Sequence, residues 1–224
     1  MGKIKKLSIA SIVIVTLAVA GYFLNLYAYG VWRYEMTITV ETPEGLKTGS
    51  AIRQGSNFVI AKIFETPPHY KGEAVVVDLG ERGVLFAQRL GPARRRAPSL
   101  TTVESIHEAN KIPFDVKSVM EEKQYPRMVS FTDLKDTKTA VLVRGWQLDH
   151  DTNEYVFEDN VEKIFGKGVR IKEITFERTK RPLSKKIGPY LPDNYEYYQT
   201  KEGWDTLPKD HQQRIDQLVT LIRK

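Results

Sequence analysis

The sequence predicts an α+β protein with an N-terminal single transmembrane helix, a mainly antiparallel β domain with a few short helices, and a C-terminal amphipathic helix. Three observations support this fold class. An almost unbroken apolar run extends from Leu7 to Ala28. Several short segments downstream alternate apolar and polar residues, which is typical of half-buried strands. Near the C-terminus, apolar residues instead recur every three to four positions, as on one face of a helix.

The apolar run predicts a membrane anchor. It is about 22 residues long, and at roughly 1.5 Å per helical residue it would cross a hydrocarbon core roughly 30 Å thick. Lys3, Lys5 and Lys6 precede it, and only Arg33 follows closely, so the positive-inside rule places the N-terminus in the cytoplasm and residues 33–224 outside. The anchor residues are Leu7, Ile12, Ile14, Leu17, Phe23 and Leu24, followed by Tyr27, Tyr29 and Trp32 as an aromatic belt at the membrane interface.

A cleaved signal peptide is the alternative. Ala18-Val19-Ala20 before Gly21 has the small-x-small pattern of a signal-peptidase site. The apolar character continues past Gly21 to Ala28, and this length favours a retained span. The aromatic residues after the run could equally begin the folded core, as we expect for Tyr34. We therefore divide the chain into a basic tail (1–6), a transmembrane helix (7–29), a β-rich domain (33–192), and a tyrosine-rich arm with the C-terminal helix (193–224).

The first half of the body predicts an antiparallel meander. Residues 34–42 alternate cleanly and are followed by the turn residues Pro43-Glu44-Gly45. One or two strands are expected between Gly49 and Glu65. Residues 74–79 and 84–90 then flank a short glycine-bounded loop, which predicts a hairpin.

The second half mixes short strands with short helices. Thr101 and Glu104 have capping-box spacing and predict a helix that Pro113 stops, and a further helical turn is expected within residues 115–124. The remaining expected elements are strands at 128–131, 140–143, 147–148, 155–157 and 169–177, the last with a bulge near Glu173, and a helical turn at 161–165. The C-terminal helix is expected from about Pro208, capped by Thr206, with His211, Ile215, Leu218, Val219 and Ile222 on one face.

Composition excludes several classes of function. The chain has 224 residues and no cysteine, which rules out disulfides, thiolate catalysis and cysteine-ligated metals. Half of the net charge of +6 comes from Lys3, Lys5 and Lys6, so the body carries only a small positive excess and we expect no nucleic-acid partner. No nucleophile elbow, phosphate-binding loop or zinc-protease helix is present, so we expect no cofactor and favour a binding function over an enzymatic one.

Three local patterns are candidate sites. Asp149, Asp151 and Asn153 follow the start of a calcium-loop pattern, but Glu154 replaces its turn glycine and Asn160 its bidentate glutamate, so an acidic hairpin loop is the preferred interpretation. Arg94, Arg95 and Arg96 could grip an acidic partner or lipid phosphates, or form a solvated loop. The aromatic residues Tyr195, Tyr197, Tyr198 and Trp204 form either a recognition surface or, in the interpretation we favour, an arm packed on its own domain.

Four segments can be compared together: VETPEGLKTGSA (40–51), GEAVVVDLGERGVLFAQR (72–89), YPRMVSFTDLKDTKT (125–139) and FGKGVRIKEITFERT (165–179). In order and spacing they resemble a group of uncharacterised bacterial membrane-anchored proteins with a β-rich extracytoplasmic domain. The resemblance covers roughly residues 34–192. It implies a bacterial envelope setting, and brings neither an activity nor catalytic residues. The chain departs from the pattern at 143–159 and in the tyrosine-rich arm.

The sequence thus predicts a single-pass protein of the bacterial inner membrane with a periplasmic body that binds or scaffolds, as an accessory subunit of a membrane protein complex. Its expected partners are the lipid bilayer and one or more membrane proteins. Two alternatives stay open: an envelope enzyme acting on glycan or lipid through carboxylates, and a secreted soluble binding protein released after Ala20.

Overall fold

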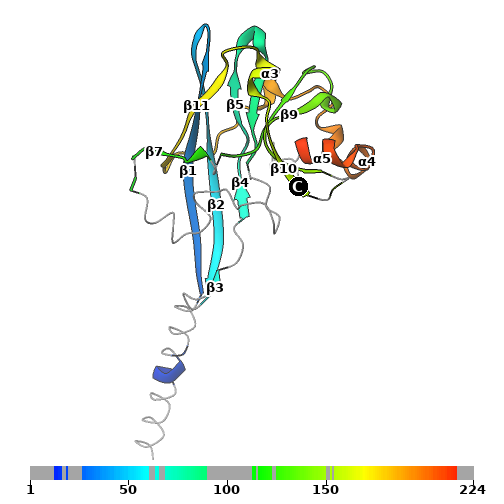
Figure 1. The fold of residues 1–224 in the computed structure, drawn as a ribbon. Helices are drawn as coiled ribbons and strands as arrows, with labels where there is room; N and C mark the ends of the chain where they lie inside the picture. Colours follow the sequence, from blue (N-terminus) through cyan, green and yellow to red (C-terminus); the bar gives the residue numbers. More distant parts are fainter. Residues whose placement is uncertain are drawn as a thin grey trace, which may run out of the picture.

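A computed structural model describes residues 13–16, 19, 27–60, 64–65, 69–89, 113–114, 116–122, 125–149, 152 and 154–215. These residues form a mainly antiparallel β domain of two sheets with a few short helices (Figure 1). This confirms the β-rich body that the alternating segments predict.

The first sheet has six strands. Its order is β3 (Phe64–Glu65), β2 (Gly45–Ile60), β1 (Tyr27–Thr42), β11 (Arg170–Arg178) and β7 (Ser118–Val119), and β4 (His69–Lys71) also pairs with β2. All of these pairings are antiparallel. β1 and β2 form a long hairpin that is visible as the blue and cyan pair in Figure 1.

The second sheet has five strands in the order β10 (Glu154–Asp159), β9 (Ala140–Asp149), β8 (Met128–Phe131), β6 (Val84–Ala87) and β5 (Val75–Asp78), again antiparallel throughout. Short helices lie between and after the strands: η1 (Gly80–Arg82), η3 (Thr137–Thr139), α3 (Val161–Phe165), η4 (Gly188–Tyr190), η5 (Tyr197–Gln199), α4 (Lys201–Asp205) and α5 (Lys209–Ile215).

Most turn and strand predictions are confirmed. Gly45, at φ 124°, closes the β1–β2 hairpin, and Gly83, at φ 104°, follows η1 in the β5–β6 hairpin. Positive φ values of this kind suit glycine, which has no Cβ to clash. β2 is a single strand, where one or two were expected. The β1–β11 register shifts between Thr39 and Val40, opposite Glu173, where the sequence predicts a bulge.

The second sheet is the middle layer of the domain. One core packs the inward face of the first sheet, including Met36, Ile38 and Ile174, against the second sheet. A second core packs the other face of the second sheet, including Phe86, against the C-terminal arm. Because both faces are covered, every residue of β6 and of β8 is buried. The arm is therefore a third layer of the fold.

Most residues of the predicted membrane anchor lie outside the described part of the chain. Within the described part of the chain, no helix is long and apolar enough to cross a membrane. Leu7, Ile12, Leu17, Phe23 and Leu24 lie outside the described residues, and Ile14 lies in a helical stretch at 13–16.

The predicted boundary at residue 29 is corrected by the first strand. Tyr27 and Tyr29 belong to β1 and not to a helix. Trp32, predicted at the membrane interface, is 2% exposed, and its ring makes an edge contact with Tyr70 at 6.4 Å between centroids. Its cross-strand partner is Gly55, where a Cβ atom would come within 2.2 Å of the indole. The absence of a side chain at Gly55 leaves the space that the Trp32 ring occupies.

The other predicted helices have different outcomes. Strand β7 occupies part of the range 115–124, where a helical turn was expected, because Ser118 and Val119 pair with the open edge of β11. A 3₁₀ turn follows at Glu122, whose carbonyl oxygen accepts from the Tyr125 N–H at 3.1 Å. Helix α5 follows Pro208 as predicted, and residues 216–224 with the rest of its apolar stripe lie outside the described part. The helix expected after Thr101 also lies outside it.

Candidate functional site

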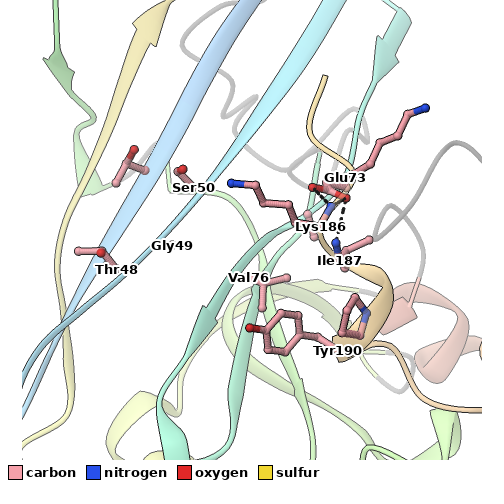
Figure 2. A pocket seen from close by; sticks show the side chains of 12 residues that line it. Thr48, Gly49, Ser50, Glu73, Val76, Lys186, Ile187 and Tyr190 are labelled. Atoms are coloured by element: carbon pink, nitrogen blue, oxygen red, sulfur yellow. Dashed lines mark hydrogen bonds between the residues drawn. The ribbon is translucent and has the colours of Figure 1, made fainter. Parts of the chain in front are cut away.

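A groove of about 640 Å³ opens where the two sheets and the segment after β11 meet. Figure 2 shows its walls, with Thr48, Gly49 and Ser50 of β2 on one side and Glu73, Lys186 and Ile187 on the other. The remaining lining residues are Thr37, Ala74, Val76, Lys185, Pro189 and Tyr190.

The floor of the groove depends on Gly49. A Cβ atom at this position would lie 1.8 Å from the main-chain carbonyl oxygen of Val76 in β5. No side chain fits in that space, so only glycine lets β2 and β5 approach this closely. The close approach joins the two sheets directly beneath the groove.

One wall is the segment of residues 179–190, here named the strap. The Ile52 N–H donates to the Ser184 hydroxyl oxygen at 2.7 Å, and the Ser184 N–H donates to the Ile52 carbonyl at 3.3 Å. The strap therefore lies along β2 over the stretch where β4 does not cover it. The strap thereby leads the chain from the first sheet to the outer face of the second sheet.

Glu73 fixes the other end of the strap. Glu73 is 2% exposed. Its carboxylate accepts hydrogen bonds from the Lys186 N–H at 2.9 Å and from the Ile187 N–H at 3.1 Å. These bonds appear as dashed lines in Figure 2. A charged acceptor binds two N–H groups more strongly than a neutral one would. Glu73 is the only carboxylate among the described lining residues, and it is engaged by main chain.

Arg53 lies behind Glu73 and is fully buried. Its guanidinium donates to the carbonyl oxygen of Ala87 at 2.8 Å, to that of Glu73 at 3.1 Å and to that of Arg89 at 3.5 Å. Burial lowers the pKa of Arg53, and Tyr34 and Glu73 oppose that shift. A single side chain of β2 therefore holds the main chain of the second sheet against the first.

The groove lining is about equally polar and apolar, and its polar part combines lysine side chains with hydroxyl groups. The lining residues include Lys185 and Lys186 and the hydroxyl-bearing Thr37, Thr48 and Tyr190. Such groups suit a ligand or partner that carries carboxylate, phosphate or hydroxyl oxygens.

The Ser50 hydroxyl, also in the groove, donates to the Glu35 carboxylate at 2.9 Å. Glu35 in turn pairs with Arg181 of the strap. Partial burial acts to raise the pKa of Glu35, but the Ser50 hydroxyl and the Arg181 guanidinium outweigh it and hold that pKa below its usual value. The rim of the groove is thereby fixed to the strap by an ion pair.

The described residues of the candidate sites predicted from sequence do not line the groove. Asp149 is the last residue of β9, and its carboxylate accepts from the Thr152 N–H at 3.3 Å in the β9–β10 hairpin. Asp151 and Asn153 lie outside the described residues, as do Arg94, Arg95 and Arg96. Over the described ranges, no three His, Cys, Asp or Glu residues are grouped so as to hold a metal ion.

The tyrosine-rich arm packs on its own domain, as the favoured interpretation predicts. Tyr195 and Tyr198 are 1% and 6% exposed in the core between the second sheet and the arm. Trp204 is partly buried against the same core. Tyr197 is the exception at 44% exposed, and its ring contacts that of Tyr198 at 5.1 Å between centroids.

Sequence reasoning does not find the groove residues. Glu73 is a single acid just before the apolar residues of β5, and such an isolated charge at the edge of a buried strand is the one local signal. Lys185 and Lys186 look like ordinary surface lysines until the strap is placed. Comparison of the chain with protein-family models, with curated proteins and with solved structures finds no match.

Proposed function

We propose that this chain is a single-pass, membrane-anchored protein of the bacterial inner membrane whose periplasmic body binds an acidic segment of a membrane-protein partner in the groove. The groove is the observation that supports binding. Its donors come from β1, β2 and the strap, and the one carboxylate among its described lining residues accepts hydrogen bonds from the strap. This lining suits an anionic or hydroxyl-rich group, and among the described lining residues Glu73 is the one carboxylate.

The shape of the first sheet is compatible with a body held away from its anchor. From Tyr34 onward β1 pairs with both β2 and β11, but from Tyr27 to Arg33 it pairs with β2 alone among the described strands. In Figure 1 this end of the hairpin points toward the short helical stretch at 13–16, away from the second sheet. The anchor and its orientation rest on the apolar run and the flanking lysines.

Charge reversal in the groove tests the binding proposal. The double variant Lys185→Glu with Lys186→Glu is compared with the double variant Lys163→Glu with Lys167→Glu, at two exposed lysines in and just after α3 that do not line the groove. After crosslinking in intact cells, the full-length protein is purified in detergent. We expect a partner adduct in the wild type and in the α3 control, and its loss in the groove variant. Recovery of a lone monomer from the wild type, or equal adducts in both variants, contradicts the proposal.

Topology needs a separate measurement. Mass spectrometry of the mature chain reports its N-terminus, and protease treatment of spheroplasts reports which side the body faces. We expect an intact N-terminus and a digestible body. A chain that begins at Gly21 would instead support the secreted alternative, and a protected body would reverse the orientation.

A further inference from the structure

Strand β10 lies at an end of the second sheet and pairs with β9 alone among the described strands. In an antiparallel sheet, about half of the N–H and C=O groups of such an edge strand point away from their neighbour. Protein edges are usually blocked by proline, by a bulge or by charged side chains, lysine above all. β10 has the sequence EYVFED and a register without a shift, so it lacks proline, lysine and a bulge, and its charges are all negative and lie at the two ends of the strand.

Two apolar side chains of β10 are exposed without serving either core. Val156 is 46% and Phe157 is 43% exposed, and neither belongs to the two core clusters. Neighbouring residues along a strand point to opposite faces, so the two side chains flank the open edge on both faces. Exposed apolar groups beside unpaired main chain are the features of a strand that another strand can extend.

Phe157 is held in place although it is exposed. Its ring makes an edge contact with Trp146, at 5.5 Å between centroids, and the Arg144 guanidinium lies 5.5 Å from the ring centre. Arg144 is itself fixed by ion pairs with Glu122 and, at 2.8 Å, with Asp159. A ring that is already ordered loses little conformational entropy on binding, which favours affinity.

Charge identifies the kind of partner. Glu154, Glu158 and Asp159 flank the exposed pair along β10. Asp159 pairs with Arg144, whose side chain is only 11% exposed, and Glu158 accepts a hydrogen bond from the Asn160 side chain at 2.8 Å. Two antiparallel copies of β10 would set Glu154 opposite Asp159 or, in the neighbouring register, opposite Glu158. Like charges directly opposite each other destabilise a strand pair. A second copy of this chain is therefore disfavoured, and a basic strand is favoured.

From this edge we infer that β10 is a docking strand for an extended segment of another protein that combines apolar and basic side chains, at a surface separate from the groove. The segment would add main-chain hydrogen bonds along β10, place apolar side chains against Val156 and Phe157, and place lysine or arginine beside Glu154 and Glu158. This inference does not depend on the groove being a binding site.

A synthetic peptide tests the inference. The probe is a short fluorescent peptide that alternates lysine with valine and phenylalanine, titrated against the full-length protein in zwitterionic nanodiscs, with empty nanodiscs subtracted. One control peptide has a central proline, and another has glutamate in place of lysine. We expect saturable binding of the basic probe that weakens with added salt, and at least about tenfold weaker binding of both control peptides.

Two variants distinguish binding of the probe at β10 from nonspecific binding to an exposed apolar residue. Val156→Lys is compared with Val119→Lys, a substitution of a valine that is 67% exposed on β7, an end strand of the first sheet. We expect Val156→Lys to weaken the probe about tenfold and Val119→Lys to leave it unchanged, with the unfolding midpoints of both near wild type. Equal effects of the two variants, equal binding of the proline peptide, or no saturable binding would each overturn the inference. If the protein forms a concentration-dependent dimer that Val156→Lys abolishes, the proposed basic partner is wrong and β10 binds a second copy of this chain.

Discussion

Replacing Arg53 by methionine should destabilise the domain more than any exposed arginine substitution. Methionine keeps much of the volume but removes the donors to the carbonyl oxygens of Ala87 and Glu73, at 2.8 and 3.1 Å. Each buried carbonyl that loses its donor costs about 1–3 kcal/mol, and the relief of a buried charge offsets part of this. We expect a net loss of about 3–5 kcal/mol, a large share of the 5–15 kcal/mol typical of a domain.

The assay is thermal and urea unfolding of the full-length protein in mild detergent, followed by tryptophan fluorescence. For a domain of this size, such a loss lowers Tm by roughly 6–20 °C. The matched control is Arg170→Met, because the Arg170 side chain is 73% exposed and only pairs with Glu41. A surface pair of this kind contributes about 1 kcal/mol or less. If Arg53→Met is as stable as wild type, or no less stable than the control, the reasoning is refuted. The desolvation cost of the buried guanidinium would then equal the stabilisation that its hydrogen bonds provide.

Three further predictions concern the groove and its rim. Gly49→Ala should lower the stability by about 1–3 kcal/mol in urea unfolding, because its Cβ meets main chain at 1.8 Å, whereas Gly188→Ala, with nothing within 4 Å, should not. Glu73→Gln should leave one buried strap N–H poorly satisfied, at a cost of about 1–3 kcal/mol, and hydrogen exchange should show faster exchange at Ile187; unchanged exchange would contradict it. Because the pKa of Glu35 is lowered from 4.5, its ionised form stabilises the fold above that pH, and the stability is lost as the pH falls through the lower folded value. The difference in unfolding midpoint between wild type and Glu35→Gln should therefore be present at neutral pH and shrink below pH 4.5; a constant difference would argue against the assignment.

Local chemistry explains which elements could be predicted. The alternation from Tyr34 to Thr42 predicts a strand because side chains on a strand point to opposite faces in turn. The glycine-bounded loop between residues 79 and 84 predicts a hairpin because it needs positive φ values. The slip near Glu173 predicts a bulge because one extra residue breaks the period of two. Each of these signals lies within a few residues of sequence.

Trp32 shows where local chemistry is ambiguous. An aromatic residue just after an apolar run is typical of a membrane interface, and it is equally typical of the first core strand. The choice depends on Gly55, which makes room for the indole from the opposite strand. Strand β7 is similar, because its pairing with β11 overrides a weak helical preference.

The sequence by itself determines the β-rich class, the hairpins and the absence of disulfides, because periodicity, turn residues and composition are local or global properties of the chain. Only the tertiary structure decides the groove, the strap and the open edge at β10. The Glu73 carboxylate meets an N–H donor 113 residues away, and no local pattern records such a pairing. Whether an exposed lysine or valine faces a groove, an edge or plain solvent depends on neighbours that folding brings together.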